Sequence, residues 1–477
     1  MFATRVSRVL IFTAASLFLL AGCKGHGSSS QIPQTLTNWN WESGSNAANS
    51  YGYYDPTTKG APTSVGQPSG RSGAMSWKDS NGQFWVFSGT GGTNDMWKFN
   101  SNSLQWTWIS GTSSSAQPAA GSYGTIGVES TSNFPGQRSS AVTWIDTSGL
   151  LWMYGGYGID SNGLVGYLND LWSFNPTTSS WTWKGGGNVG GSSSTTCSWG
   201  SIGVAATSNQ PSPRSNGAAW TDTSTGNFYM FGGQGYLSTL CGGSNSTGLQ
   251  NDFWQYNPVS NQWTWLGGTQ SFYTKGIYGQ QNHPALTNQP GARQSATTWT
   301  DVTGAFWMFG GSGIDWEDGN GLLNDLWKFD PATGMWTWVS GANTINTIGN
   351  YGTVGVAAST NQPGSRWGGM GWSDSGGNLW LFGGYGINAS GTIVVLNDLW
   401  EYQGALKQWV WINGSYNGNV AGYYGTITVL SGSNMPGSRY GASGWKDSSG
   451  DFWMFGGDGN DAVGANGHLG DVWKFIP

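Results

Sequence analysis

Charged residues are scarce in this chain. They make up 9% of its 477 residues, with 18 Lys and Arg against 24 Asp and Glu, a formal net charge of −6 and a pI near 4.9. Proteins that bind nucleic acid need a basic surface, so this balance excludes nucleic acid as the expected partner. Disorder is also excluded, because disordered chains are rich in charge and poor in aromatic residues, whereas 15% of this chain is aromatic.

Long apolar runs are missing except near the N-terminus. There, Val9 to Leu20 form an almost uninterrupted apolar run behind Arg5 and Arg8. The run is too short to span a bilayer, and its flanks are those of a cleaved signal peptide. We therefore expect the chain to be exported.

The end of this run, Leu20-Ala21-Gly22-Cys23, resembles a bacterial lipobox. The resemblance implies that residues 1–22 are a lipoprotein signal peptide, that Cys23 is lipidated, and that residues 23–37 form a flexible linker. The lipid is then the only expected membrane attachment. By resemblance to such lipoproteins, Lys24 after the cysteine favours the outer membrane, on its periplasmic or surface-exposed side. The alternative is an ordinary secretory signal with an incidental cysteine.

Glycine and tryptophan are abundant instead, with 81 and 32 residues. All but three of the tryptophans fall into a repeat that begins with Trp-x-Asp, continues with an aromatic run ending in glycine, and then has Asp-x-Trp and Trp-x-Trp. The first element occurs at Trp77, Trp144, Trp220, Trp299, Trp372 and Trp445. The third occurs at Asp95, Asp170, Asp252, Asp325, Asp398 and Asp471.

The fourth element, Trp-x-Trp, has five copies within these repeats, and its sixth copy stands near the N-terminus at Trp39-Asn40-Trp41. The last repeat ends just where its own Trp-x-Trp should begin. A ring gains from such a permutation, because the N-terminal strand can complete the last repeat unit. We therefore expect residues 39–41 to pair beside the final strand of the chain.

Each element has the pattern of a strand. Phe306-Trp307-Met308-Phe309 is apolar at every position, as in a strand buried on both faces, and Trp-Thr-Trp alternates with period two. The repeat resembles the kelch repeat, the type found in the central domain of galactose oxidase. That resemblance implies an all-β fold, a six-bladed kelch β-propeller over residues 38–477 with four antiparallel strands per blade, and a monomer.

Two connections in each repeat are long: the one from the second to the third strand, and the one from the fourth strand to the next blade. In a propeller blade, these two connections lie on one face, while the short turns lie on the other. Loops on a rigid scaffold commonly carry binding function, so this long-loop face is the candidate. Cys197 and Cys241 both fall in its connections, and an exported protein favours a disulfide between them.

Six arginines open the six innermost strands: Arg71, Arg138, Arg214, Arg293, Arg366 and Arg439. Around a channel mouth they would attract an anionic ligand, as arginines do in some kelch propellers. Alternatively, each arginine forms a structural pair with the recurring aspartate of Asp-x-Trp, since a residue repeated in every blade is typical of structure.

The three tryptophans outside the repeat are Trp199, Trp316 and Trp367, all in or beside the long connections. They could stack on a sugar, anchor a protein partner, or pack within the loops. The loops at Asp315–Asn320 and Asp458–Asp461 could hold calcium or be solvated acids. Apart from that calcium, no cofactor and no metal site is expected.

No catalytic residue is assigned. A copper site of the galactose-oxidase kind lacks ligands, because His283 and His468 belong to loops two blades apart. The sequence therefore favours a binding scaffold for a protein or polysaccharide. Two alternatives remain: a carbohydrate-active enzyme, such as a sugar epimerase or oxidase, that uses Asp315, Glu317 or Asp318, and a structural protein of envelope assembly.

Overall fold

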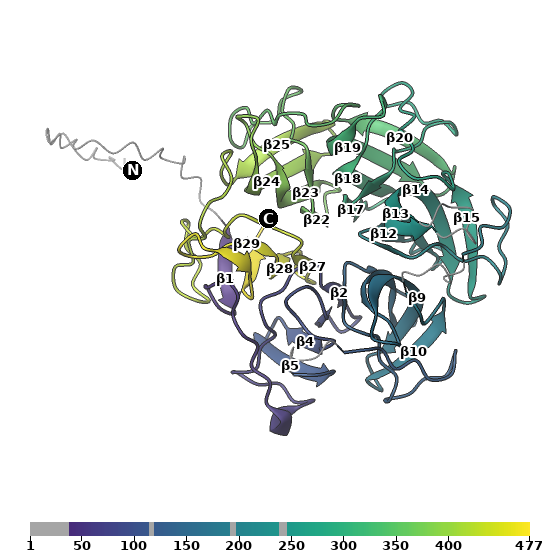
Figure 1. The fold of residues 1–477 in the computed structure, drawn as a ribbon. Helices are drawn as coiled ribbons and strands as arrows, with labels where there is room; N and C mark the ends of the chain where they lie inside the picture. Colours follow the sequence, from purple (N-terminus) through teal and green to yellow (C-terminus); the bar gives the residue numbers. More distant parts are fainter. Residues whose placement is uncertain (1–37, 114–118, 191–196, 238–245) are drawn as a thin grey trace, which may run out of the picture. The chain divides into compact units, whose positions relative to one another are not determined.

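The all-β class that the repeats predict is confirmed by a computed structural model, which describes residues 38–113, 119–190, 197–237 and 246–477. These residues belong to the compact unit Gln34–Pro477. They form a β-propeller in which antiparallel sheets stand around an axis as six blades (Figure 1). In the described ranges the one helical segment is η1 (Pro56–Thr58), and no helix there has the length and hydropathy needed to cross a bilayer.

Each blade has four main strands, and in blades 1 to 5 these follow one another outward from the axis in chain order. Blade 1 contains β2 (Met75–Lys78), β3 (Phe84–Phe87), β4 (Met96–Asn100) and β5 (Gln105–Ser110). Blade 2 contains β7 (Val142–Ile145), β8 (Leu151–Ile159), β9 (Val165–Asn175) and β10 (Ser180–Gly185). Blade 3 contains β12 (Ala218–Thr221), β13 (Phe228–Leu237), β14 (Ser246–Asn257) and β15 (Gln262–Gly267).

The second half of the chain repeats this arrangement. Blade 4 contains β17 (Thr297–Thr300), β18 (Phe306–Ile314), β19 (Asn320–Asp330) and β20 (Met335–Ser340). Blade 5 contains β22 (Met370–Ser373), β23 (Leu379–Ile387), β24 (Ile393–Gln403) and β25 (Gln408–Asn413). Blade 6 contains β27 (Ser443–Lys446), β28 (Phe452–Phe455), β31 (Val472–Phe475) and, as its outermost strand, β1 (Trp39–Ser43).

The sequence predicts that each arginine opens the innermost strand of its blade, and this is wrong for five of the six, which start a separate two-residue strand. These short strands are β6 (Arg138–Ser139), β11 (Arg214–Ser215), β16 (Arg293–Gln294), β21 (Arg366–Trp367) and β26 (Arg439–Tyr440). The break between β6 and β7 lies at Ser140, whose φ of 56° cannot continue a strand. Blade 6 carries two further short strands, β29 (Asp458–Asn460) and β30 (Asn466–His468), which pair beside β26.

Strand β1 pairs antiparallel with β31, with Trp39 opposite Phe475 and Trp41 opposite Trp473. The Trp39 side chain is fully buried. Its ring centroid lies 5.0 Å from that of Phe475 and 5.1 Å from that of Phe382 in blade 5. The sixth blade thus takes its fourth strand from the opposite end of the chain.

Aromatic stacking joins neighbouring blades. The Trp144 ring of the innermost strand in blade 2 stacks on Phe228 of blade 3, with centroids 5.2 Å apart and an interplanar angle of 5°. The Trp445 ring of blade 6 stacks in the same way on Phe84 of blade 1, at 4.9 Å and 1°. The tryptophans of the repeat are therefore mainly packing residues between blades.

The connection that enters each blade covers the outer edge of that blade. Before blade 2, Gly127 N donates to Trp183 O (2.8 Å) and Ser130 N to Trp181 O (3.2 Å), both on β10. An exposed edge strand is a template for aggregation, and these bonds occupy it. These connections are thus ordered parts of the blades, bonded along the outermost strands.

Replacing Trp39 by Ala removes the buried ring that joins β1 to blades 5 and 6. We expect the free energy of unfolding, measured by urea denaturation, to fall by about 3–5 kcal/mol. The control is Trp316→Ala, because the Trp316 side chain is 47% exposed and should change stability by about 0.5 kcal/mol or less. Equal stability of the two variants would contradict the packing of β1.

Candidate ligand-binding site

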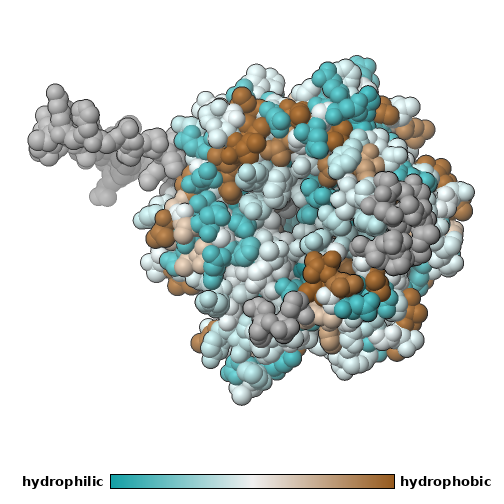
Figure 2. All heavy atoms as spheres, viewed as in Figure 1, coloured by the Kyte–Doolittle hydropathy of each residue, from teal (hydrophilic) through white to brown (hydrophobic). Residues whose placement is uncertain are grey.

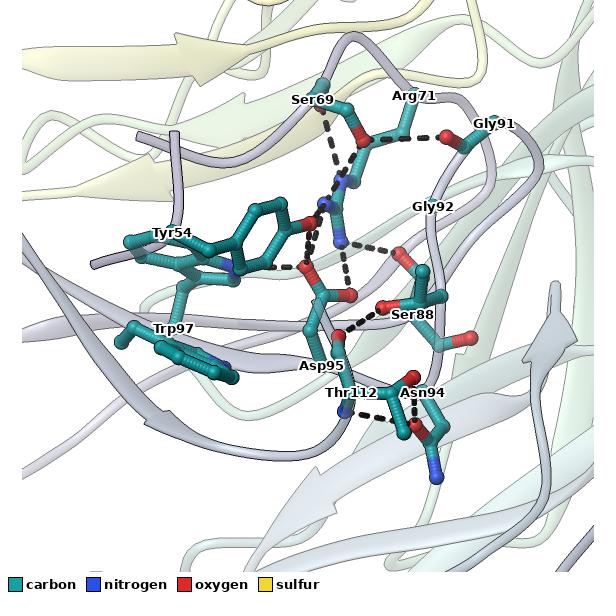
Figure 3. Close-up of polar contacts among 12 residues, drawn as sticks. Tyr54, Ser69, Arg71, Ser88, Gly91, Gly92, Asn94, Asp95, Trp97 and Thr112 are labelled. Atoms are coloured by element: carbon teal, nitrogen blue, oxygen red, sulfur yellow. Dashed lines mark hydrogen bonds and ion pairs between the residues drawn. The ribbon is translucent and has the colours of Figure 1, made fainter. Parts of the chain in front are cut away.

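In blade 1, the Arg71 guanidinium and the Asp95 carboxylate form an ion pair through two hydrogen bonds (Figure 3). Nη1 donates to Oδ1 at 2.8 Å and Nη2 donates to Oδ2 at 2.7 Å. Nε and Nη1 also donate to the backbone carbonyls of Ser69 and Ser88. Neither side chain of the pair has exposed surface.

Two further donors complete the carboxylate. Asp95 Oδ2 accepts from the Tyr54 hydroxyl at 2.6 Å and from Trp97 Nε1 at 2.6 Å. Trp97 belongs to the Asp-x-Trp element, and Tyr54 belongs to the connection that enters the blade. One buried unit thus ties that connection, the short arginine segment and the third strand together.

The same ion pair recurs in the other five blades, at N–O distances of 2.6–2.8 Å. Its members are Arg138–Asp170, Arg214–Asp252, Arg293–Asp325, Arg366–Asp398 and Arg439–Asp471. A tyrosine hydroxyl donates to the aspartate in four of these blades, from Tyr123, Tyr278, Tyr351 and Tyr424. The tyrosine role was missed from the sequence, although this tyrosine recurs in the entering connections.

These contacts change the expectation for Arg71 and its five counterparts. A ligand-binding arginine needs exposed donors, but all six guanidinium groups have at most 1% exposed surface and bond within their own blades. None of the six lines the axial cavity. The geometry is that of the structural pair, the second of the two interpretations that the sequence leaves open.

The pair also controls proton binding. Burial alone would raise the pKa of Asp95, but the charge and hydrogen bonds of Arg71 outweigh burial and lower that pKa below its usual range. Burial and the neighbouring Asp95 carboxylate raise the pKa of Tyr54 to about 12. The unit therefore stays charged at Asp95 and neutral at Tyr54 across the physiological range.

A ring of backbone hydrogen bonds surrounds the axis just after the arginines. Each N–H donates to a carbonyl of the preceding blade at 2.7–2.9 Å, and the first blade donates to the last through Gly73 N and Gly441 O. All six residues have φ between 54° and 67°, which glycine, serine and asparagine fill. They are Gly73, Ser140, Asn216, Ser295, Gly368 and Gly441.

A cavity of about 510 Å³ lies on the axis, lined by this ring and by the residues around it. The side chains that distinguish its wall are Ser72, Thr90, Gln294, Ser312, Trp367 and Tyr440. No Asp, Glu, Lys, Arg or His is among the lining residues that the structure describes. Figure 2 shows mostly white to teal residues around the centre of this face, with a brown patch just below the central hollow and others farther out. The volume is typical of a small-molecule site.

One side of the cavity is aromatic. The Trp367 ring lies 4.8 Å from Tyr440 and 5.6 Å from Tyr385, measured between ring centroids. Tyr385 and Tyr440 are 5.9 Å apart, so the three rings form one cluster on blades 5 and 6. Burial, with Asp458 and Tyr385 nearby, raises the pKa of Tyr440, which therefore stays a neutral hydroxyl.

The repeats differ at the cavity and agree in the scaffold. The residue after each arginine is Ser72, Ser139, Ser215, Gln294, Trp367 or Tyr440. By contrast, arginine, aspartate and the tryptophan of Asp-x-Trp occupy their positions in all six blades. Positions that vary among otherwise equivalent repeats are free of the structural constraint and are candidates for recognition. This comparison within the chain could have located the site from the sequence.

The three tryptophans outside the repeat have different surroundings in the structure. Trp367 lines the axial cavity, and Trp316 is an exposed residue between β18 and β19. Trp199 is buried and packs on Trp254 and Trp265, with centroids 5.2 and 5.3 Å away. It takes the place that tyrosine has in the other blades, so its role is packing within the loop.

The remaining site predictions concern cysteine, calcium and the lipid. Cys197 is buried and disulfide-bonded, but Cys241 lies outside the described residues, so their pairing stays a prediction. Cys23 also lies outside them. No group of three or more His, Cys, Asp or Glu in the described ranges is placed to hold a metal. The calcium site stays untested.

The predicted acidic residues of the loops have structural contacts. Asp315 Oδ1 accepts from the N–H groups of Glu317 and Gly319 at 2.8 Å, and Oδ2 accepts from Ile345 N at 3.0 Å. This carboxylate therefore joins the loop to the next connection.

In blade 6, His468 Nδ1 lies 3.2 Å from Asp458 Oδ2, while Tyr440 and His468 are both register partners of Asp458.

The chain shows little sequence similarity to known proteins. No family model matches the sequence, and none of the curated proteins matches it. Among solved structures, one titled "Structure of YjhT" is similar, with a TM-score of 0.49 and 14% identity over 85% of this chain and 95% of that chain. At that identity and score, the likeness carries no argument about function.

Breaking one of the buried ion pairs should lower the free energy of unfolding far more than breaking an exposed ion pair. Arg293→Met leaves the Asp325 carboxylate buried without its partner, and we expect a loss of about 3–5 kcal/mol in the free energy of unfolding. The control is Lys275→Met, because Lys275 and Asp318 form an exposed pair that should contribute about 1 kcal/mol or less. A similar loss in both variants, by urea denaturation, would refute a structural role for Arg293.

Stability should fall at both ends of the pH scale. The folded pKa of Asp95 is lowered, so its stabilisation is complete above the ordinary value of 3.8 and is lost as pH falls through the folded pKa. The folded pKa of Tyr54 is raised from 10 to about 12, so its contribution is complete below pH 10 and is lost as pH rises toward 12. Thermal melts of the protein and of Tyr54→Phe should differ most in alkaline slope. Identical slopes would contradict this origin.

Proposed function

We propose that this chain is an exported, lipid-anchored kelch-type propeller that binds a protein or carbohydrate ligand in its axial cavity. The signal peptide of residues 1–22 and lipidation at Cys23 would place it at the outer membrane, as a monomer without a cofactor. A single observation carries the binding role: six equivalent repeats agree in their buried scaffold but differ at the cavity wall. The long connections rise from the same face.

The side chains of the cavity wall support a ligand-binding role for the cavity more than a structural role. Ser72, Thr90, Gln294 and Ser312 make no side-chain hydrogen bond to another described residue, so their hydroxyl and amide groups are available to a ligand. Trp367 and Tyr440 add partly exposed rings at the same cavity. Pockets that bind small ligands combine apolar surface with a few convergent polar groups in this way.

A carbohydrate-active enzyme is the second candidate. It is favoured by one observation, namely that Tyr440, Asp458 and His468 stand in one cross-strand row found in blade 6. A carboxylate that faces one imidazole nitrogen orients the other for proton transfer. Asp315, the acid predicted for such a role, is instead committed to backbone donors. Turnover of the bound ligand separates the enzyme from the binding protein.

Filling the cavity should abolish binding without unfolding the protein. Ser312→Trp places a large ring at the cavity wall, and we expect it to remove the ligands that the full-length protein captures from envelope extract and from a glycan array. The control is Val259→Trp, because Val259 is 90% exposed in the turn between β14 and β15, on the other face. Capture retained by Ser312→Trp, or lost equally in both variants, would contradict the proposal.

A further inference from the structure

The charge of the axial cavity limits what can bind there. No Asp, Glu, Lys, Arg or His is among its described lining residues, Tyr440 is a neutral hydroxyl, and the nearest guanidinium groups are closed in ion pairs. An anionic ligand would leave water without gaining a counter-charge, which is costly in a partly enclosed site. An uncharged ligand avoids this cost.

The aromatic cluster supplies a surface for an apolar face. Trp367, Tyr385 and Tyr440 contact one another at centroid distances of 4.8–5.9 Å, which holds the rings in fixed orientations. Tyr385 is 36% exposed, and Trp367 is partly exposed at the cavity. A pyranose ring has one face covered by C–H groups, and aromatic rings bind such a face by hydrophobic and dispersion contacts.

Hydrogen-bonding groups occupy the wall contributed by other blades. Ser72 and Thr90 come from blade 1, and Gln294 and Ser312 come from blade 4. Each pair consists of register neighbours, so both project toward the same space: Ser72 bridges Thr90, and Gln294 pairs with Ser312. Hydroxyl and amide groups can donate and accept, which matches a ligand that has several hydroxyl groups.

We infer that the axial cavity binds a neutral saccharide. The sugar's C–H face lies on Trp367 and its neighbouring tyrosines, and its hydroxyl groups bond to Gln294 and Ser312. This inference rests on the proposed binding function and specifies its ligand class. It separates neutral sugars from acidic sugars and from peptides.

The test uses the full-length protein with maltotriose, cellotriose, xylotriose and chitotriose as neutral probes. Trigalacturonate and an acidic peptide are the charged probes. Calorimetric titration should give binding to at least one neutral trisaccharide and an affinity that changes less than twofold between 50 and 500 mM salt, since no ion pair forms. Preferred binding of a charged probe, with affinity that falls as salt rises, would overturn the inference.

Single-residue variants test whether the ligand contacts both the aromatic wall and the polar wall of the cavity. We expect Trp367→Ala to weaken neutral-sugar binding at least tenfold and Gln294→Ala to weaken it at least threefold, while Trp316→Ala leaves it unchanged. Trp367→Phe should restore part of the affinity, which keeps the test valid if the alanine variant unfolds. Unchanged affinity in both Trp367→Phe and Gln294→Ala would overturn the inference.

The outcomes distinguish the inference from the function on which it rests. If Ser312→Trp abolishes binding of an acidic or peptide probe, the cavity is a binding site and the neutral-saccharide inference is wrong. If no probe and no extract component depends on Ser312, the proposed function fails together with the inference.

Discussion

The buried ion pair between arginine and aspartate is the contact on which each blade depends. It joins three segments that are separate along the chain: the connection entering the blade, the short arginine segment and the third strand. Such a pair is stabilising only when its remaining donors and acceptors are satisfied. Here tyrosine, tryptophan and backbone carbonyls complete it, which explains why a chain with 9% charged residues keeps this pair in all six repeats.

Much of the fold could be predicted from the sequence because repetition amplifies weak patterns. The pairing of residues 39–41 beside the final strand follows from counting elements, and the apolar second strands follow from their sequence pattern. The separate arginine strands could not be predicted, because they depend on positive φ at residues such as Ser140, and serine rarely marks such a break. The tyrosine partner was also missed, since its distance from the aspartate along the chain hides the contact.

The sequence predicts ligand-binding residues on the long-loop face; of these, Trp367 lines the axial cavity, whereas the six arginines are buried in ion pairs within the blades. The arginines recur in every blade, and this recurrence reflects the structural ion pair with aspartate and not ligand binding. The cavity wall instead uses the positions just beside it, where Gln294, Trp367 and Tyr440 differ from their counterparts. A symmetric scaffold thereby carries an asymmetric surface, with rings on blades 5 and 6 and polar groups on blades 1 and 4. Recognition of an unsymmetrical molecule requires this difference.

The pairing of β1 with β31 also has a consequence for folding during synthesis. Asn38 and Ile476 are hydrogen-bonded across 438 positions of the chain, so β1 is made long before its partner. Until then, the indole rings of Trp39 and Trp41 have no sheet to cover them. Contacts this distant in sequence form slowly, and exposed apolar segments invite aggregation. The first strand therefore stays unpaired until the last blade has been made.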